Sequence, residues 1–487
     1  MKTSRHHFTL AARIAITLGA VALTSGVSFA DLPADLDAPG DTPQMRGLGM
    51  GCHFGRMPNW DIDKLVPLLK QLGVQYVRDS WGWQKVETTK GTYSMPPDAQ
   101  HKLDTLNAAG LKVIAVLAFG NKLYENPLDS DAFANYAGWM ATTFKGKVTA
   151  WEIWNEPDNF FFLKQYGGKR DGSDDAAWVA KYSELVCKTV ATIKQADPNV
   201  TVLHNIEGES WLNALKAHAA DYAHVDGIDL HTYPKHMLEQ GAEGKDDTHS
   251  MVAKLDNNSS AWPKQYLGHP LQCWVGECGL TMFEPPAKQA KTDFTSVSGT
   301  LQAAGEIRST LIGLAYGVKA WCIYDFVDET ADPHDVESNF GLIRDYTHNY
   351  ELKPAYYAVR RMARLLGPDW KLQPGFGATL DAELVPPPEA SPWLKANLAQ
   401  VYWFRVGNHE VTIVWKAGKP DLANPVELGK ITWPGADKGI TAEAVDMVTG
   451  KSVDVKLSRD AHGATLSGVP LGWAPVAIRW VVPQSSQ

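Results

Sequence analysis

The feature that most constrains the fold is a repeated alternation of short apolar runs with longer amphipathic runs, from Arg46 to about Gly367. Strands that alternate with helices pair in parallel through right-handed crossovers. At this length the pattern predicts a closed (β/α)₈ barrel over residues 46–367 rather than an open doubly wound sheet. The eight strand candidates are Leu48–His53, Gln75–Arg78, Val113–Phe119, Val148–Trp154, Val200–His204, Gly227–Thr232, Gln272–Gly276 and Ala320–Tyr324. The helical patterns include Ile62–Leu72, Ala99–Ala109, Phe133–Phe144, Ala176–Ala196, Trp211–Ala219 and Leu301–Tyr316.

After Gly367 the pattern changes to alternating strand-like runs without helices. A short turn containing Gly407-Asn408 joins the first two runs, which is a hairpin signal. Residues 368–487 are therefore predicted to form a small all-β, sandwich-like domain, with a proline-rich loop at Val385–Pro392. We expect this domain to dock on the barrel as a structural appendage; a glycan-binding role is the alternative. The strand candidates are Gln400–Val406, Glu410–Trp415, Ile440–Val445, Ser452–Leu457, Ala464–Ser467 and Val476–Val481.

The first 30 residues have the pattern of an export signal. A basic stretch is followed by a mostly apolar run over Ala15–Leu23, and Ser28-Phe29-Ala30 places small residues at the positions that signal peptidase requires. The apolar run is shorter than the roughly 20 residues that span a bilayer, and no later segment qualifies. The sequence therefore predicts cleavage near Ala30, a periplasmic or extracellular protein without a membrane span, and a linker over residues 31–45.

Charge and cysteine content exclude several classes of function. With 46 Lys and Arg against 55 Asp and Glu, the net charge is −9, so nothing indicates a nucleic-acid partner. The five cysteines show no CxxC spacing, and four lie on or beside apolar strand segments, which favours buried thiols. One bridge, Cys273–Cys278 or Cys52–Cys322, stays open. The 18 Trp suit packing and also stacking against sugar rings.

Two glutamates stand where strands four and seven end. Glu156 lies in Trp151-Glu152-Ile153-Trp154-Asn155-Glu156-Pro157, and Glu277 lies in Trp274-Val275-Gly276-Glu277-Cys278-Gly279. In a (β/α)₈ barrel the active site lies at the carboxyl ends of the strands, so we expect both carboxyl groups at the barrel mouth. A facing pair of carboxyl groups is what hydrolysis of a glycosidic bond requires.

The segments WEIWNEP and VGECG resemble the signature pair of clan A glycoside hydrolases, which are (β/α)₈ barrels. The resemblance covers residues 46–367; within the clan it is greatest to family 39, with family 5 as the nearest competitor. It implies that Glu156 is the acid/base and Glu277 the nucleophile of a retaining enzyme. Such enzymes hold the two carboxyl groups about 5–5.5 Å apart. Cys278 departs from the bulkier residue that relatives more often carry after the nucleophile.

The same resemblance implies further substrate-binding residues at strand ends. Arg78 matches a clan arginine near the nucleophile, and Asn155 matches the residue that binds the sugar 2-hydroxyl. His231 and Tyr233 match a pattern in which the tyrosine hydroxyl contacts the nucleophile, and Trp321 resembles the tryptophan under the sugar at the cleavage site. Each has an ordinary structural alternative, such as an ion pair for Arg78 or core packing for Trp321.

Other candidates rest on position alone. His53 on strand one could contact a sugar hydroxyl. Trp81 and Trp83 follow strand two, and core packing is slightly favoured for them. Phe160-Phe161-Phe162 follow the expected acid/base, and three successive phenylalanines cannot all face a core.

The function predicted from the sequence is that of a secreted retaining glycoside hydrolase acting on an oligo- or polysaccharide. Strand one offers His53 but no HxH pair, which disfavours a metal-dependent barrel hydrolase, and we expect neither metal nor cofactor. A non-catalytic glycan-binding barrel is the alternative from another class. It would be expected to lack one of the two glutamates. The sugar, the linkage, exo or endo action and the oligomeric state stay open.

Overall fold

The structure is a computed structural model of the chain. It describes residues 32–159, 161–169, 171–234, 251–289, 292, 294–373, 379–382, 384, 395, 397–418, 426–434, 439–460 and 463–481. The predicted leader and the proline-rich stretch at 385–392 lie outside the described residues.

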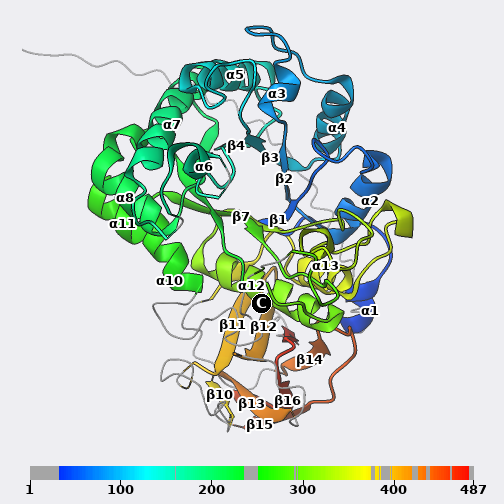
Figure 1. Cartoon of the computed structure of the whole chain (residues 1–487). Coiled ribbons are helices and arrows are strands. Elements are labelled where there is room, and N and C mark those ends of the chain that lie inside the picture. The colour runs from blue at the N-terminus through cyan, green and yellow to red at the C-terminus, as the bar shows by residue number, and fades with distance from the viewer. Residues whose placement is uncertain are drawn as a thin grey trace, which may run out of the picture.

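Eight parallel strands form a closed barrel in sequence order, as predicted (Figure 1). The barrel closes where Leu48 of the first strand pairs with Trp321 of the last. Each predicted strand is present, and the seventh runs two residues further than expected, through Glu277 and Cys278. The strands are β1 (Leu48–Gly51), β2 (Tyr76–Ser80), β3 (Lys112–Leu117), β4 (Ala150–Ile153), β5 (Thr201–His204), β6 (Gly227–His231), β7 (Gln272–Cys278) and β8 (Trp321–Ile323).

Helices surround the barrel, and their ends follow local sequence signals (Figure 1). In α2, Asp61 caps the first turn through the Asp63 amide, and Gly73 ends the helix at φ 81°. The main helices are α2 (Ile62–Leu72), α4 (Pro97–Ala108), α5 (Ser130–Thr143), α7 (Ala176–Ala196), α8 (Gly208–His218), α10 (Met251–Asp256), α11 (Trp262–Tyr266), α12 (Gly299–Tyr316) and α13 (Pro354–Leu366). Short segments are α3 (Trp83–Val86), α6 (Phe162–Tyr166), η1 (Ala219–Tyr222), η2 (Asn257–Ala261), η3 (Glu337–Asn339) and η4 (Tyr346–His348).

The barrel interior is filled in layers by alternate strand residues. One buried cluster consists of Tyr76, Ile114, Ala150, Leu203, Trp274, Ala320 and Cys322. Side chains on a strand point alternately to its two faces, so a residue two positions further along points the same way. Arg78 and Glu152 therefore lie one layer above Tyr76 and Ala150, towards the carboxyl ends of the strands. This layer carries the polar groups of the site.

The C-terminal region contains two antiparallel sheets, which confirms the all-β prediction. Buried residues from both sheets, such as Ile431, Leu466, Val414 and Trp480, form a common core. The expected strand at Ser452–Leu457 was misplaced, because the structure has a strand at Lys456–Asp460. One sheet contains β10 (Thr379–Asp381), β13 (Glu427–Pro434), β16 (Gly463–Leu471) and β15 (Lys456–Asp460); the other contains β14 (Thr441–Asp446), β17 (Val476–Val481), β12 (His409–Lys416), β11 (Ala399–Val406) and β9 (Lys371–Leu372).

The segment expected to be a linker contains a helix, α1 (Leu32–Asp37), which packs on α13 and near β14. Asp37 makes a bidentate ion pair with Arg361 of α13, at 2.8 and 3.0 Å. Asp35 pairs with Arg479 of β17 at 3.0 Å. Because Arg361 also donates to the Val448 carbonyl at 2.8 Å, residues 32–45 join the barrel to the C-terminal sheets.

The cysteines are thiols, so neither bridge considered above is formed. Cys52, Cys273, Cys278 and Cys322 are buried, as predicted, and Cys187 is exposed. Among the described residues, no helix combines the length and apolar character needed to cross a membrane.

Candidate active site

Glu277 stands near the end of β7, inside the barrel mouth. Its Oε1 accepts a hydrogen bond from Arg78 at 2.8 Å, and its Oε2 accepts one from the Tyr233 hydroxyl at 2.6 Å. The β6–β7 ladder shifts register between Leu230 and His231, so that His231 pairs with Glu277. The backbone thus places both side chains at one level of the mouth. Tyr233 and Arg78 occupy the positions that the sequence analysis assigned to them.

Glu156 follows β4 in a tight turn. Its backbone has a φ of 44°, a left-handed conformation that costs a non-glycine residue about 1–2 kcal/mol. Its amide donates to Asn205 Oδ1 at 2.5 Å. Its carboxyl group contacts His231 Nδ1 at 2.8 Å and accepts from Asn159 Nδ2 at 2.7 Å. The side chain is 20% exposed, which leaves it accessible from the mouth.

The two carboxyl groups face each other. One oxygen of Glu156, one oxygen of Glu277 and Nδ1 of His231 all lie within 4.8 Å of one another. The imidazole stands between them, at 2.8 Å from Glu156 Oε1 and 3.5 Å from Glu277 Oε2. A close pair of carboxyl groups matches the spacing of about 5–5.5 Å in retaining glycosidases, whereas inverting enzymes need about 6.5–9.5 Å.

Arg78 organises the floor of the site. Its Nε and Nη2 donate to the two oxygens of Glu152, both at 2.7 Å, and its Nη1 donates to Glu277. Its Nη2 also donates to Asn155 Oδ1 at 2.8 Å, and Asp229 Oδ2 lies 3.7 Å from its Nε. Burial opposes the charge of Arg78, but Glu152 and Glu277 raise its pKa well above the ordinary value. The guanidinium is therefore a permanent cation.

His231 is a second cation. Burial opposes its charge, but Glu277, Asp229 and Glu156 together raise its pKa well above the ordinary value. Its Nε2 lies 3.5 Å from Asp229 Oδ2 and 3.3 Å from Arg78 Nη2. From the sequence alone, this residue could have been a site residue or a satisfied core histidine. The structure places it in contact with both strand-end glutamates.

His53, at the end of β1, lies on the rim beside the end of β8. Its Nε2 is 3.6 Å from Asp325 and 3.5 Å from Glu329, and its ring contacts Tyr324 at 5.5 Å. Burial, followed by Arg56 and Arg78, lowers its pKa well below the ordinary value, so the imidazole is neutral. A neutral imidazole on the rim can bond to a sugar hydroxyl.

Within the part of the chain that the structure describes, three groups of side chains have the spacing of metal ligands. They are His53 with Asp325 and Glu329; Glu152 with Asp229 and His231; and Glu156 with His231 and Glu277. In the first group, Arg56 already pairs with Glu329. In the other two, Arg78 pairs with Glu152 or Glu277. These arrangements are networks of ion pairs in which Arg56, Arg78 and His231 supply the positive charge.

Trp321 does not face the carboxyl groups, which corrects its expected place in the sugar subsite. It is fully buried, and it packs outwards against α12, where a Cβ on Gly313 would lie 2.1 Å from its ring. The inward position belongs to Tyr324, three residues later, because Cys322 of the interior cluster and Tyr324 share one face of the strand. The Tyr324 ring contacts Tyr233 at 5.9 Å and Phe340 at 5.4 Å.

Other site residues were missed by sequence reasoning, although a signal for them existed. Glu152 lies four positions before Glu156, and Asp229 lies two before His231 on the same face of its strand. Because residues two positions apart on a strand share a face, counting back from the strand ends would have predicted that Glu152 and Asp229 lie in the barrel mouth. Asn205, which holds the Glu156 amide, follows β5 directly.

The aromatic residues near the mouth mostly stabilise loops. Trp81 and Trp83 are buried, as slightly favoured. Phe162 is also buried, against Trp154. Phe161 is partly exposed and stacks on Phe119 at 4.7 Å, whereas Phe160 lies outside the described residues.

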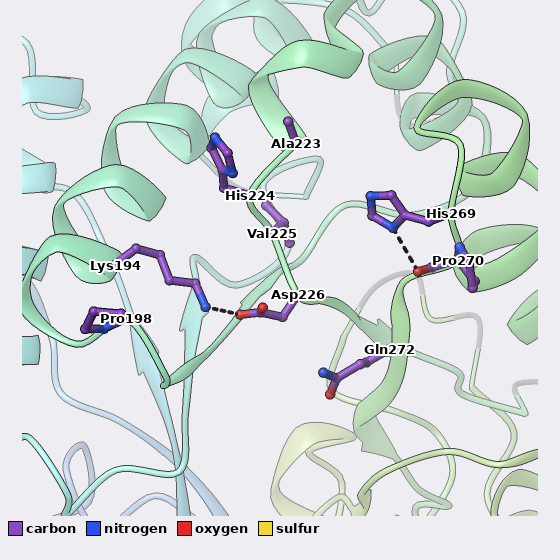
Figure 2. A pocket seen from close by; sticks show the side chains of 9 residues that line it. All are labelled: Lys194, Pro198, Ala223, His224, Val225, Asp226, His269, Pro270 and Gln272. Carbon is purple, nitrogen blue, oxygen red and sulfur yellow. Dashed lines mark hydrogen bonds and ion pairs between the residues drawn. The ribbon is translucent and has the colours of Figure 1, made fainter. Parts of the chain in front are cut away.

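A hollow of about 730 Å³ lies at the opposite end of the barrel, before β5, β6 and β7 (Figure 2). Lys194 points across it to Asp226, with a contact of 2.6 Å, and His269 turns back to the Pro270 carbonyl. The amino-terminal end of a barrel of this kind contributes stability rather than catalysis. This hollow is therefore separate from the paired carboxyl groups.

The model of the family described as Cellulase (glycosyl hydrolase family 5) matches residues 36–310, more than half of the chain. No curated protein matches the chain in sequence.

Solved structures are similar in fold at low sequence identity. A family 39 glycoside hydrolase from the gut symbiont Bacteroides cellulosilyticus WH2 is 20% identical, with a TM-score of 0.65 over 90% of this chain and 81% of that chain. A family 39 β-xylosidase from Caulobacter crescentus is 14% identical, with a TM-score of 0.53 over 91% and 98%. A family 30 subfamily 8 xylanase from Clostridium acetobutylicum is 12% identical, with a TM-score of 0.52 over 91% and 98%.

Together these findings confirm a clan A glycoside hydrolase with a fold similar to that of family 39. The family model that matches is nevertheless that of family 5, which the sequence analysis placed second. The chain belongs to the family of Cellulase (glycosyl hydrolase family 5), and it is a glycosidase.

Proposed function

We propose that this protein is a secreted retaining glycoside hydrolase in which Glu277 is the nucleophile and Glu156 the acid/base. The observation that carries the proposal is the approach of the two carboxyl groups, with one oxygen of each within 4.8 Å. The spacing leaves room for one anomeric carbon and no room for a water molecule on the opposite face of the sugar. The reaction belongs to the barrel, residues 46–367, and residues 368–487 form a supporting domain.

In the first step Glu277 attacks the anomeric carbon while Glu156 gives its proton to the leaving oxygen. The bond between the anomeric carbon and that oxygen breaks, and a glycosyl ester forms on Glu277. In the second step Glu156, now a carboxylate, removes a proton from water, and the water oxygen displaces Glu277. The product keeps the configuration of the substrate, and both carboxyl groups return to their first states.

The neighbouring groups support these roles. Arg78 and the Tyr233 hydroxyl each donate to one oxygen of Glu277, which fixes the orientation of the carboxylate. The amide group of Asn155 is held by Arg78 beside the anomeric position, where it can bind the sugar 2-hydroxyl. Such a bond strengthens in the transition state. Tyr324 and His53 supply the ring face and the polar contact for the same sugar.

Paired substitutions test the assignment. Glu277→Ala and Glu156→Ala should each lower kcat on an aryl glycoside by more than about 10³-fold, because each removes a group that acts in the chemical step. Azide should restore turnover to both variants, giving a glycosyl azide of inverted configuration with Glu277→Ala and of retained configuration with Glu156→Ala. Glu184→Ala, which removes a surface carboxylate paired with Lys188 of the same helix, is the matched control. Turnover near the wild-type value in either catalytic variant would refute the mechanism.

The substrate panel follows from the comparisons. Because similar structures include a β-xylosidase and a xylanase, and the family is described as cellulase, aryl β-xyloside and aryl β-glucoside are the first substrates to compare. We propose a β-linked glycan as the natural substrate. Hydrolysis of aryl α-glycosides alone would contradict this.

Export is proposed from the leader at residues 1–30. Expression of the full chain should yield a protein in the periplasm or medium whose amino-terminal sequence begins near Asp31. Recovery of the uncut chain from the cytoplasm of an export-competent host would contradict the proposal.

A further inference from the structure

Glu152 is a buried carboxyl group beneath the site that the proposed mechanism does not use. It lies on β4 with no exposed surface. Each of its oxygens accepts one hydrogen bond from Arg78, at 2.7 Å, so that it holds the Nε and Nη2 edge of the guanidinium. The planar, two-bond arrangement fixes both the place and the orientation of the arginine head.

The orientation decides where the remaining nitrogen points. With Nε and Nη2 bound to Glu152, Nη1 is directed at Glu277 Oε1, at 2.8 Å. Asn155 Oδ1 accepts from Nη2 at 2.8 Å, so the same clamp also places the amide beside the anomeric position. One buried carboxyl group therefore sets the geometry of two groups at the site.

The surrounding backbone leaves space for this arrangement. A Cβ on Gly276, the residue before Glu277, would lie 2.6 Å from Arg78 Nε and 2.0 Å from Asp229 Oδ2. Glycine at this strand position lets the guanidinium and Asp229 lie directly against the backbone of β7. Asp229 Oδ2 lies 3.7 Å from Arg78 Nε.

We propose that Glu152 is a positioning residue, which acts on Glu277 and Asn155 through Arg78 and never touches the substrate. The inference rests on the proposed role of Glu277. Its specific consequence is that removal of Glu152 should slow the chemical step and weaken the support of the ionised nucleophile, with little effect on the binding of substrate in the ground state.

The test uses the full-length enzyme and an aryl glycoside that it hydrolyses. Glu152→Ala should lower kcat by about 10–100-fold and change KM by less than about threefold, because a charge-assisted bond to the nucleophile loses its alignment. The acidic limb of the kcat/KM profile should move to higher pH. Glu152→Gln keeps the shape and one acceptor for Arg78, so it should lose less activity, about 3–10-fold.

A double-mutant cycle isolates the route through Arg78. If Glu152 acts only by holding Arg78, Arg78→Ala and the Arg78→Ala/Glu152→Ala double variant should have the same kcat and the same acidic limb. A further independent loss in the double variant would overturn the proposal. The matched control is Glu410→Gln, which removes a buried carboxylate paired with Arg405 at 2.6 Å in the C-terminal region and should leave the pH profile unchanged.

The outcomes separate this inference from the proposed function. Azide-rescued loss of activity in Glu277→Ala, with wild-type kcat and pH profile in folded Glu152→Gln and Glu152→Ala, would overturn the positioning role alone. Wild-type turnover in Glu277→Ala would overturn the nucleophile assignment first. Thermal unfolding of each variant shows whether it is folded, and Glu152→Gln provides the decisive measurement if Glu152→Ala does not fold.

Discussion

His204, at the end of β5, is a fully buried imidazole without a charged partner. Its ring packs against Trp211 at 4.3 Å and Tyr222 at 5.1 Å, and neither ring nitrogen has a hydrogen-bond partner among the described residues. Burial lowers the pKa of His204 from 6.5 to about 3. The side chain is therefore neutral in the folded protein throughout the range in which an exposed histidine gains a proton.

This depressed pKa makes the folded protein sensitive to acid. Above pH 6.5 the imidazole of His204 is neutral in both the folded and the unfolded protein. Below pH 6.5 it is protonated in the unfolded chain, whereas in the folded protein it stays neutral down to about pH 3. The free energy of unfolding should thus fall by about 1.4 kcal/mol per pH unit across this window. In His204→Phe, the fall between pH 7 and pH 4.5 should be smaller by about 3 kcal/mol. Urea titrations at the two pH values measure it.

The exposed His224 supplies the control for this experiment. His224→Phe should leave the pH dependence as it is in the wild type. If His204→Phe loses stability on acidification as steeply as the wild type, another group is responsible for the acid sensitivity.

Trp321 and Tyr324 lie on opposite faces at the end of β8, so the proposed contact with the sugar belongs to Tyr324 rather than to Trp321. Tyr324→Leu should raise KM by about 3–10-fold, because it removes the aromatic surface that we propose to lie under the sugar. Trp321→Phe should leave KM unchanged and lower the thermal midpoint, because that ring packs against Gly313 of α12. Initial rates across substrate concentrations, together with thermal unfolding, distinguish the two. A larger KM effect in Trp321→Phe would reverse the assignment.

The sequence could predict some residues of the site but not Tyr324. Glu156 and Glu277 could be predicted because a motif marks them, and Arg78 and Tyr233 because they match further residues of the same clan pattern. Tyr324 was missed because β8 is only three residues long, and an apolar run of this length does not show which of its side chains point inwards. The face is decided by the closure of the barrel, in which Leu48 pairs with Trp321.

At the scale of the element, the packing of β7 depends on Gly276, the small residue before Glu277. Gly276→Ala would place a Cβ in the space held by Asp229 and Arg78. We expect kcat to fall by at least about 10-fold through displacement of Arg78, with a loss of stability of about 1–3 kcal/mol from overpacking. Gly82→Ala is the control, because the nearest atom to its Cβ would be the Ala118 carbonyl oxygen at 3.5 Å and its φ of −62° suits alanine. Equal activity of the two variants would contradict this role of Gly276.

The bounds of helices and strands were predicted correctly where the apolar residues of the segment follow a single helical or strand period. α2 and α7 have the predicted bounds, because apolar periodicity agrees there with the stop signals that follow, Gly73 after α2 and Asp197-Pro198 after α7. β13 (Glu427–Pro434) was missed because Gly429, Lys430 and a terminal proline interrupt its pattern. Its pairing with β16, across a bulge at Gly429, is a non-local contact that a local pattern does not encode.

At the scale of the whole molecule, Arg361 links three parts of the chain. It pairs with Asp37 of the N-terminal segment, belongs to α13 of the barrel and donates to the Met447 and Val448 carbonyls. Arg308 of α12 likewise lies over the Trp473 ring at 4.8 Å. Both guanidinium groups are buried where the barrel meets the C-terminal sheets.

Removal of the Arg361 guanidinium should uncouple the unfolding of the barrel from that of the C-terminal sheets. Arg361→Leu should lower the free energy of unfolding by about 2 kcal/mol, because it leaves two carbonyls and a carboxylate without their donor. Calorimetry should show one unfolding transition for the wild type and a broadened or divided transition for Arg361→Leu. Arg344→Leu, which removes a surface pair with Glu351, should change stability by less than about 0.5 kcal/mol. An unaltered single transition in Arg361→Leu would contradict the linking role.

Residues 32–45 contact both the barrel and the C-terminal sheets, and these contacts limit which shortened forms of the protein can fold. A fragment cut at residues 46 and 367 would carry the whole catalytic mouth, yet it would leave the guanidinium of Arg361 without Asp37 and the ring contact of Arg308 without Trp473. Such an excised barrel would expose to solvent the surface that the C-terminal sheets and residues 32–45 cover in the full chain, and it should aggregate. Practical minimisation of this enzyme should therefore begin at its loops and leave both chain ends in place.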